Sequence, residues 1–403
     1  MSSRKKVSIF GVTGSIGKSA ADVILNAPER FEVHTVTAAK NVAALADAAI
    51  RLNARQAVIA HEEYREPLIA ALSGTGIRVR AGRRDLIEAA VEPVDVMLAA
   101  IIGFDGLRPI LAALESGINV AIANKEPLVA AGALVKETAR KSGAKLLPVD
   151  SEHNAIFQVL EEKNTANIEK IFLTASGGPF LNWTKDQMEQ ASPEEAIAHP
   201  NWSMGPKISV DSATMMNKAL EIIEASVLFD FKPAQIEVLI HPQSVVHSLV
   251  AYTDGSVLAQ LGESDMRIPV AHALAWPQRL DKGGRRLDLT AIGSLTFQSP
   301  DFEKFPALRY AYECLERGES ACIALNAANE VAVSAFLNNR IGFTDIMACI
   351  ANALSDTRCN PEAKGPKTVE EIEKLDQTVR ALTEEYIESL LTQVQHRKTV
   401  NHS

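Results

Sequence analysis

The 403-residue sequence predicts an α/β fold whose N-terminal part is a mostly parallel, doubly wound sheet. Three observations lead to this prediction. Short apolar segments alternate with alanine-rich helical segments through the first third of the chain, a glycine turn follows the first apolar segment, and the pattern becomes helical from residue 307 onward. We therefore expect a second α/β region in the middle of the chain and a C-terminal helical domain.

The first third contains five apolar segments with the length and composition of buried strands. They span residues 6–10, 31–37, 57–60, 94–102 and 119–123. Helical segments separate several of them, at residues 18–26, 41–52 and 107–116. Because strands and helices alternate, we expect the strands to pair in parallel.

A glycine turn, Gly11-Val-Thr-Gly14-Ser-Ile-Gly17, joins the first strand to the first helix. Glycines at such a turn let the backbone approach a pyrophosphate, whose negative charge is stabilised by the N-terminus of the helix. The order strand, turn, helix therefore favours a Rossmann-like dinucleotide site. The spacing is G-x-x-G-x-x-G rather than G-x-G-x-x-G, and a tight turn without a ligand is the alternative.

The residues after the second strand bear on the choice of cofactor. An NAD enzyme usually places an acidic residue there for the ribose, whereas this chain has Lys40 and Asn41. A cation and an amide suit a 2′-phosphate, so we predict NADP, and a solvated lysine is the alternative. Asn124, Lys125 and Glu126 follow the fifth strand, at the end where open α/β sheets bind ligands. The alternative is that these three residues cap the next helix, a role that suits Lys125 least well.

Asp150 and Glu152 follow an apolar run at residues 144–149 that we interpret as the end of a strand. Residues two apart on a strand project to the same side. Two carboxylates directed at one point repel each other, so a divalent cation, a shared proton or basic partners must hold them there. The alternative is a helix cap, in which Asp150 or Ser151 accepts hydrogen bonds from the first turn of a helix that runs through residues 154–160.

The middle third supplies further polar groups. A strand at residues 168–174 leads into Ser176 and two glycines, where amides and a hydroxyl could bind an anion, although a simple turn would explain the same residues. Residues 183–206 contain prolines at 193, 200 and 206, so we expect a loop rather than a regular helix. We interpret this loop as a lid that carries Trp202; packing of Trp202 on the neighbouring domain is the alternative.

A helix is predicted to begin near Ser212. On it, Asn217 and Glu221 are four residues apart and Lys218 and Glu221 are three apart, so an amide, a cation and a carboxylate share one face. Lys–Glu pairs also occur on surface helices for solubility alone, and that reading stays open from these residues.

The last part of the chain predicts a sheet followed by helices. Strands at residues 236–239, 245–251 and 256–261 would form a sheet that buries the site and offers a dimer surface. Helices at residues 321–337, 344–354 and 369–395 would form a C-terminal domain that braces the catalytic one.

Composition limits the classes of function. The hydrophobic content of 47% suits two or three domains, and the net charge of -9 leaves no broad basic field for nucleic acid or an anionic membrane. The cysteines form no C-x-x-C pair and are interpreted as reduced thiols. The first residues lack an apolar stretch long enough for a signal peptide, and no later run approaches the length of a membrane span. We therefore expect a cytoplasmic protein.

Eight strings, in order along the chain, resemble the 1-deoxy-D-xylulose 5-phosphate reductoisomerase family of the methylerythritol phosphate route to isoprenoids. They are GVTGSIG, ANKE, LLPVDSEHNAIFQ, TASGGPF, HPNWSMG, KISVDSATMMNKALE, IHPQSVVHS and ALNAANE. The likeness runs from Gly11 to about Asp345. It implies NADPH and Mg²⁺ or Mn²⁺ as cofactors, a small phosphorylated sugar as substrate, and a homodimer.

The resemblance also implies roles for individual residues. The NADPH contacts would be Thr13, Gly14, Ser15, Ile16, Ala39, Lys40, Asn41, Asn124, Glu126 and Gly205. The metal ligands would be Asp150, Glu152 and Glu221. The substrate contacts would be Lys125, Ser151, Glu152, Ser176, His199, Trp202, Ser212, Asn217, Lys218 and Glu221. The catalytic groups would be Lys125, Asp150, Glu152, His199 and Glu221.

Three positions depart from the family pattern. Ala39 stands where we expect glycine, Pro127 where serine is common, and Leu181 where arginine often follows the GGPF string. Ala39 could shift the adenosine end of the cofactor, and none of the three removes a catalytic group.

The resemblance implies a domain order. Residues 1–150 would form the NADPH-binding Rossmann-like domain, and residues 151–285 the catalytic, metal-binding and dimerisation domain with a lid at 196–206. Residues 286–311 would form a linker and residues 312–403 the C-terminal helical domain.

The family rearranges the carbon skeleton of 1-deoxy-D-xylulose 5-phosphate and reduces the product with NADPH to 2-C-methyl-D-erythritol 4-phosphate. A hard cation held by three carboxylates would polarise a carbonyl and acidify a hydroxyl, and ligation by oxygen alone favours Mg²⁺ or Mn²⁺ over Zn²⁺. Two other classes of protein explain fewer of these residues. A semialdehyde dehydrogenase needs a cysteine nucleophile beside the nicotinamide, and all four cysteines follow residue 310. A redox-sensing regulator would not need three carboxylates.

Overall fold

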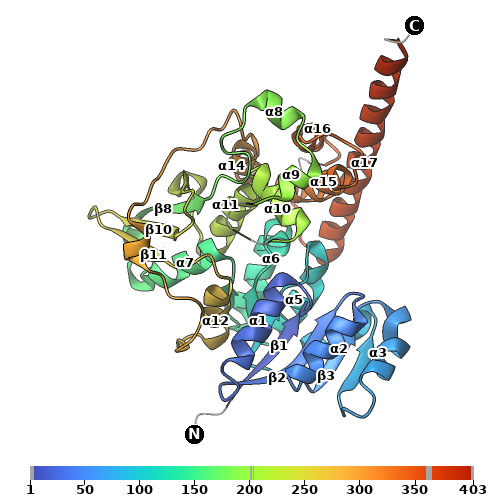
Figure 1. The fold of residues 1–403 in the computed structure, drawn as a ribbon, viewed down its shortest axis with the longest axis vertical. Helices are drawn as coiled ribbons and strands as arrows, with labels where there is room; N and C mark the ends of the chain where they lie inside the picture. Colours follow the sequence, from blue (N-terminus) through green and yellow to red (C-terminus); the bar gives the residue numbers. More distant parts are fainter. Residues whose placement is uncertain (1–3, 200–201, 203, 360–364, 401–403) are drawn as a thin grey trace. The chain divides into compact units, whose positions relative to one another are not determined.

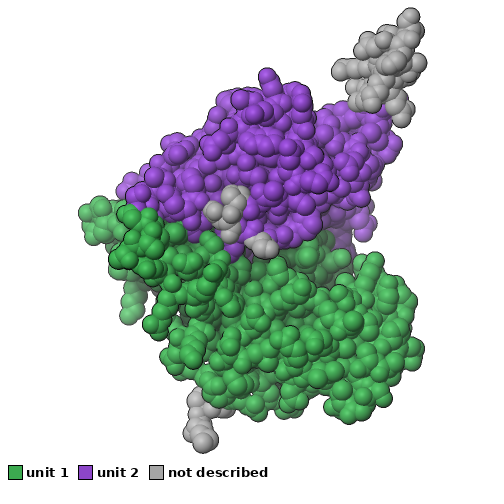
Figure 2. Space-filling view, viewed as in Figure 1, with its two compact units in different colours: residues 1–127, 133–168, 245–293 green, residues 128–132, 169–244, 294–403 purple. Residues whose placement is uncertain are grey.

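The computed structural model describes residues 4–199, 202, 204–359 and 365–400. The chain forms two compact units (Figure 2). Unit 1 comprises residues 1–127, 133–168 and 245–293, and unit 2 comprises residues 128–132, 169–244 and 294–403. This division differs from the expected domain order, because residues 245–293 lie in the same unit as the N-terminal sheet.

Unit 1 contains a seven-stranded sheet in the order β4-β3-β2-β1-β5-β6-β7. Every neighbouring pair is parallel, with Val7 of β1 opposite Val33 of β2 and Val96 of β5. The strands are β1 (Lys5–Phe10), β2 (Phe31–Ala38), β3 (Gln56–Ile59), β4 (Arg78–Ala81), β5 (Val96–Ala99), β6 (Asn119–Ile122) and β7 (Leu146–Pro148). Strand order reverses at β1, which confirms the predicted Rossmann-like sheet.

Helices connect these strands, as the blue and cyan part of Figure 1 shows. They are α1 (Ser15–Leu25), α2 (Val42–Arg51), α3 (Arg65–Ala71), α4 (Arg83–Ala90), α5 (Leu107–Glu115), α6 (Glu126–Ser142) and α7 (Ser151–Val159). Small residues allow close approach to the sheet, since α1 buries Gly17, Ala20 and Ala21 beside Val23 and Ile24.

Unit 1 also contains β10 (Val246–Tyr252) and β11 (Val257–Leu261), which pair antiparallel, then α12 (Arg267–Ala275) and the short α13 (Leu289–Ile292). Helix α7 packs against β10 and β11, and α12 packs against α1 and α7. The strands were expected within about a residue of these bounds. Helix α12 was not predicted, because none of the eight strings that resemble the family lies on it.

Unit 2 contains β8 (Ile168–Ala175) and β9 (Ile236–Ile240), which pair in parallel. Its helices are α8 (Lys185–Glu189), α9 (Pro193–Ile197), α10 (Pro206–Ala213), α11 (Met216–Phe229), α14 (Ala307–Arg317), α15 (Glu319–Leu337), α16 (Asp345–Ser355) and α17 (Val369–Val400). The last four confirm the predicted C-terminal helical region, which ends in the red helix α17 of Figure 1.

Helix α15 is the core helix of unit 2. Among the helices that the structure describes, it alone combines a length and an apolar composition that would suit a membrane, and 83% of its apolar window is buried. All four cysteines are buried and free. Burial raises the pKa of the Cys314 and Cys349 thiols to about 12, so both are unreactive core residues.

Two expectations for residues 183–216 were wrong. The segment taken for a loop contains α8 and α9, each begun by a capping box, at Thr184 with Gln187 and at Ser192 with Glu195. Pro193 stands in the first turn of α9, where proline is tolerated. The helix expected to begin near Ser212 is two helices, because α10 ends at Ala213 and Met215 adopts a left-handed conformation with φ of 61°.

Candidate active site

The glycine turn after β1 has the conformation that a phosphate-binding turn needs. Gly11 has φ of +98°, and a Cβ there would lie 2.3 Å from the Ala100 carbonyl oxygen; a Cβ on Gly17 would lie 2.2 Å from the Gly11 oxygen. Only glycine fits either position. Gly14, the N-cap residue of α1, supplies no side-chain cap. The amides of Ser15 and Ile16 therefore begin the helix at a turn that admits a close ligand.

The residues after β2 lie beside this turn in the sheet order. Ala39 and Lys40 are exposed, and the Ala39 carbonyl accepts a hydrogen bond from the His61 amide at 3.3 Å. The Asn41 side chain accepts a hydrogen bond from the Ala44 amide at 3.0 Å and so caps α2. Capping occupies the single side-chain oxygen of Asn41, whereas Lys40 is exposed just after the carboxyl end of β2.

Asn124, Lys125 and Glu126 follow β6 at the same end of the sheet. Asn124 donates a hydrogen bond to the Ile101 carbonyl after β5. Lys125 is the N-cap residue of α6 by position, but its side chain makes no capping hydrogen bond. The Lys125 ammonium instead lies 2.8 Å from Oδ2 of Asp150. The capping alternative is therefore wrong for Lys125, and unit 1 brings it together with a predicted metal ligand.

Asp150 and Glu152 do not project from a strand, because β7 ends at Pro148. Asp150 is the N-cap residue of α7, where its Oδ1 accepts a hydrogen bond from the Glu152 amide at 3.2 Å. Glu152 stands in the first turn of α7 and accepts a hydrogen bond from the Ser151 hydroxyl. The expected strand geometry was wrong and the cap exists, yet carboxylate oxygens of Asp150 and Glu152 lie within 4.8 Å of one another.

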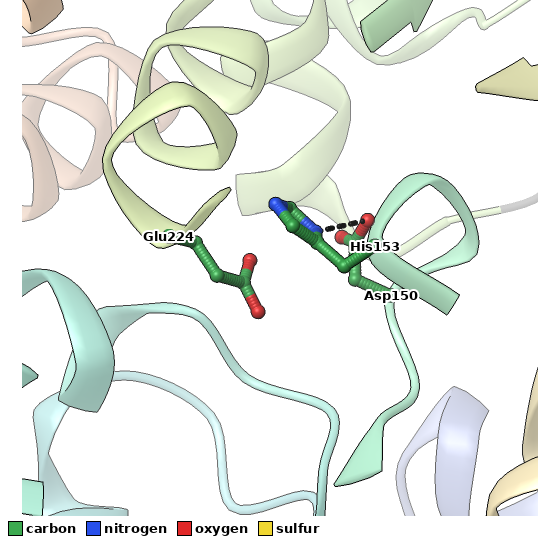
Figure 3. A group of neighbouring side chains, drawn as sticks. All are labelled: Asp150, His153 and Glu224. Atoms are coloured by element: carbon green, nitrogen blue, oxygen red, sulfur yellow. Dashed lines mark hydrogen bonds and ion pairs between the residues drawn. The ribbon is translucent and has the colours of Figure 1, made fainter. Parts of the chain in front are cut away.

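His153 also contacts the Asp150 carboxylate. Its Nδ1 donates a hydrogen bond to Oδ1 of Asp150 at 3.1 Å, the dashed line in Figure 3. The His153 side chain is fully buried. Asp150 is therefore oriented by an ammonium, an imidazole and a backbone amide before any metal binds.

Helix α7 is anchored one turn further on by Asn154. Its Nδ2 donates to the Pro148 carbonyl at 2.8 Å and contacts His272 Nδ1 of α12 at 3.1 Å. Burial, with a smaller effect of Arg279, lowers the pKa of His272 to about 4, so the imidazole is neutral near pH 7 and accepts at Nδ1. These bonds fix the start of α7, and with it the two carboxylates.

Unit 2 contains a polar cluster at the end of β8. The Ser176 hydroxyl oxygen lies 3.0 Å from His199 Nε2 and accepts a hydrogen bond from the Gly178 amide at 3.2 Å. The Trp202 amide donates to His199 Nδ1 at 3.0 Å, so Nε2 carries the proton of a neutral ring and donates to Ser176. Burial lowers the pKa of His199, which favours this neutral form. The Ser176 oxygen then accepts two hydrogen bonds, which leaves its hydroxyl proton to donate to a ligand.

The glycine loop after Ser176 contacts the end of α10. Gly178 has φ of +68°, and a Cβ there would lie 2.5 Å from the Ser212 carbonyl oxygen. Only glycine allows this approach, so unit 2 brings Ser176 and Ser212 onto neighbouring segments. Gly205 is the N-cap residue of α10. Residues 200, 201 and 203 of the expected lid lie outside the described residues, so the lid remains a prediction.

The predicted polar face of α11 is present and buried. Asn217 and Lys218 both donate hydrogen bonds to the Glu221 carboxylate, one to each oxygen. The side chains of Lys218 and Glu221 are 4% and 1% exposed. A solubility role is therefore wrong, because these groups do not face solvent.

Comparison with known proteins agrees with these motifs. A family model described as 1-deoxy-D-xylulose 5-phosphate reductoisomerase matches residues 7–132, and two models of the C-terminal domain of that enzyme match residues 146–229 and 261–382. The enzyme of Rhodospirillum centenum is 53% identical over 351 residues, with 87% of each chain covered. That of Zymomonas mobilis is 47% identical over 390 residues, with 97% of this chain and 100% of the relative covered. The chain belongs to the 1-deoxy-D-xylulose 5-phosphate reductoisomerase family.

Solved structures of the reductoisomerase family have the same fold. The Zymomonas mobilis enzyme in complex with NADPH has a TM-score of 0.89 at 44% identity, covering 96% of this chain and 100% of that one. A reductoisomerase in complex with NADPH, fosmidomycin and magnesium has a TM-score of 0.92 at 44% identity, covering 96% and 99%. This chain is accordingly an enzyme of the reductoisomerase class.

The sequence analysis missed two buried titratable residues, His153 and Glu224. His153 stands inside the quoted string LLPVDSEHNAIFQ, and Glu224 follows Glu221 by three residues on α11, from which it extends in Figure 3. Glu224 is 1% exposed. The sequence did contain a signal for both. His153 follows the predicted ligand Asp150 by three residues, and Glu224 follows the predicted ligand Glu221 by three, so each pair would share a helix face.

Proposed function

We propose that this chain converts 1-deoxy-D-xylulose 5-phosphate to 2-C-methyl-D-erythritol 4-phosphate with NADPH and a divalent metal, Mg²⁺ or Mn²⁺. Membership of the reductoisomerase family supports this proposal. The observation that carries it is a pair of buried lysine–carboxylate contacts, Lys125 with Asp150 in unit 1 and Lys218 with Glu221 in unit 2. Each unit thus holds a lysine paired with a carboxylate.

The carboxylates fit a hard divalent cation. Asp150 and Glu152 offer oxygens from the first turn of α7, and Glu221 offers a third carboxylate from α11. The donors are oxygens only, which suits Mg²⁺ or Mn²⁺. A cation bound by them would polarise the substrate carbonyl and acidify the neighbouring hydroxyl. Lys125 and Ser151 would hold the substrate oxygens beside these ligands.

NADPH would bind at the carboxyl end of the seven-stranded sheet. The amides of the glycine turn, from Thr13 to Ile16, would bind the pyrophosphate. The exposed Lys40 would bind the 2′-phosphate, with Asn41 beside it. Asn124 and Glu126 after β6, and Gly205 before α10, would contact the remainder of the cofactor.

The phosphate of the substrate would bind in unit 2. The hydroxyl proton of Ser176, the hydroxyl of Ser212, the amide of Asn217 and the ammonium of Lys218 are the donors that a phosphate dianion requires. His199 would keep Ser176 in its donating orientation. Binding of this remote group would position the reacting carbons, with Trp202 excluding water.

We further propose a homodimer in the cytoplasm. Strand β11 pairs with β10 and exposes Val257 and Leu258 at 51% and 40%. An apolar strand edge of this kind favours pairing with a second copy. Buried free thiols suit a reducing compartment.

The proposed activity is tested by following NADPH oxidation with 1-deoxy-D-xylulose 5-phosphate, with and without EDTA. We expect oxidation that requires both the sugar phosphate and Mg²⁺ or Mn²⁺. NADPH binding without oxidation under metal-replete conditions would contradict the proposal and favour the regulator class.

A further inference from the structure

The string ALNAANE lies on α15, and the proposed function gives it no role. Its residue Asn329 is fully buried, and its Nδ2 donates a hydrogen bond to Oδ1 of Asp211 on α10 at 2.9 Å. Asp211 is 1% exposed. Its other oxygen, Oδ2, lies 2.8 Å from the Lys207 ammonium one turn earlier on α10. A buried carboxylate thus ties α10 to the core helix of unit 2.

The Asn329–Asp211 bond is one of the contacts that position α10, which also packs against α9 and α11. The helix has only 8 residues and ends at Ala213, so its own hydrogen bonds stabilise it weakly. A buried carboxylate that lost one of its donors would carry a large desolvation penalty, so Asp211 stays on Asn329. The Asn329–Asp211 bond therefore ties the last turn of α10 to α15.

Ser212 follows Asp211 directly in that last turn, against the Gly178 loop that carries Ser176. A shift of α10 would move the Ser212 hydroxyl relative to Ser176. We propose that Asn329 is a positioning residue for the phosphate site: through Asp211 it holds α10 so that Ser212 and Ser176 donate to one phosphate group. This inference rests on the proposed function, which assigns both serines to the phosphate.

Asn326 provides a matched control. It lies one turn earlier on the same helix, is also fully buried, and donates through Nδ2 to Glu330 at 3.3 Å. Glu330 in turn pairs with Arg380 of α17. Asn326→Ala therefore removes the same amide from the same helix without touching Asp211.

The experiment measures KM for 1-deoxy-D-xylulose 5-phosphate, kcat, KM for NADPH and the melting temperature of Asn329→Ala, Asn326→Ala and Ser212→Ala. We expect Asn329→Ala to raise the sugar-phosphate KM on the order of tenfold, the effect of one lost charge-assisted bond, with the NADPH KM little changed. Asn326→Ala should lower the melting temperature similarly and leave the sugar-phosphate KM within about twofold. Equal KM values for the two asparagine variants would overturn the inference.

Two further variants keep the test decisive if Asn329→Ala does not fold. Asp211→Ala cuts the same bond from α10 and should raise KM alike, whereas Asp211→Asn keeps an oxygen for Asn329 and should restore most of the affinity. Asn329→Ala combined with Ser212→Ala should be no worse than Ser212→Ala alone, because both act on one contact. An unchanged KM in Ser212→Ala would instead contradict the proposed phosphate site itself.

Discussion

The ammonium of Lys125 lies 2.8 Å from Oδ2 of Asp150, and each side chain is 11% exposed. This contact joins the segment after β6 to the N-cap residue of α7 within unit 1. The lysine places a positive charge beside a proposed metal ligand. The contact therefore determines what happens when either residue is changed.

Lys125→Met should strengthen Mn²⁺ binding and weaken catalysis. Removal of a positive charge beside the ligands should raise Mn²⁺ affinity by about fivefold to tenfold, and loss of a substrate contact should lower kcat by about 10²-fold. Calorimetric titration with Mn²⁺ and steady-state kinetics measure the two effects. Lys141→Met, at an exposed lysine of α6, is the control and should change neither. Weaker Mn²⁺ binding in Lys125→Met would contradict this prediction.

Asp150→Asn and Glu152→Gln should both weaken Mn²⁺ binding, but they should differ in stability without metal. Asparagine can still cap α7, yet it leaves the buried Lys125 without its ion pair, which should cost about 1–3 kcal/mol of unfolding free energy. Glu152→Gln keeps an oxygen that can accept the hydrogen bond from the Ser151 hydroxyl, so it should melt within about 2 °C of the parent. Melting curves in EDTA, with Mn²⁺ titrations, measure both. Full Mn²⁺ affinity in Asp150→Asn would leave Asp150 with a capping role only.

Gly178→Ala should lower both stability and substrate affinity. Its left-handed backbone disfavours a side chain, and the new Cβ would meet the Ser212 carbonyl at 2.5 Å. We expect a loss of about 2–4 kcal/mol in unfolding free energy. Gly255→Ala is matched, because Gly255 has φ of +89° with nothing within 4 Å of a Cβ, so only about 1 kcal/mol should be lost. Chemical denaturation of both variants tests this, and equal losses would show that the contact with α10 is unimportant.

Lys40→Asp should narrow the preference for NADPH over NADH by about 10²-fold, because a carboxylate repels the 2′-phosphate and accepts from a free 2′-hydroxyl. The kcat/KM values for both cofactors provide the measurement. Lys145→Asp makes the same charge change at the amino end of β7 and should leave the ratio unaltered. The prediction fails if the unmodified protein uses both cofactors equally well.

Stability should fall as pH falls below about 6.5 because of His272, whose pKa burial lowers to about 4. Above the ordinary pKa of 6.5 the ring is neutral in both states; between 6.5 and about 4 the unfolded chain binds a proton that the folded chain does not. The ring is only partly buried, so we expect a loss of about 1–2 kcal/mol across this window.

His272→Gln keeps an acceptor for Asn154 but cannot take up the proton, so its melting temperature should depend less on pH in this window. The His61→Gln variant, at an exposed ring, serves as the control. Identical pH profiles for the parent and His272→Gln would exclude His272 as the source.

The sequence predicted the sheet well because its signals are local. Apolar runs such as residues 31–37 need only their own composition to indicate a buried strand, and the glycine turn needs only its spacing. Lys218 and Glu221 were placed on one face by helical periodicity alone. Their burial was not predictable, because it depends on what packs over α11.

The errors have physical causes. The break between α10 and α11 rests on Met215, a non-glycine residue with positive φ that no local preference indicates. The prolines near α9 were read as helix breakers, although Ser192 and Glu195 form a capping box that starts a helix at Pro193. Asp150 was assigned to a strand end, and capping and metal binding were treated as alternatives. One carboxylate has two oxygens and can serve both roles.

The segmented construction of unit 1 affects how the protein is made. Helix α12, which packs against α1 and α7 and brings His272 to Asn154, is encoded after residues 169–244 of unit 2. A ribosome therefore releases β1 to α7 long before α12 emerges. During that interval the nascent chain carries uncovered apolar faces on α1 and α7, which are the surfaces that chaperones recognise. A chain whose translation stops before residue 267 would lack His272 and with it the contact that α12 makes to Asn154 of α7.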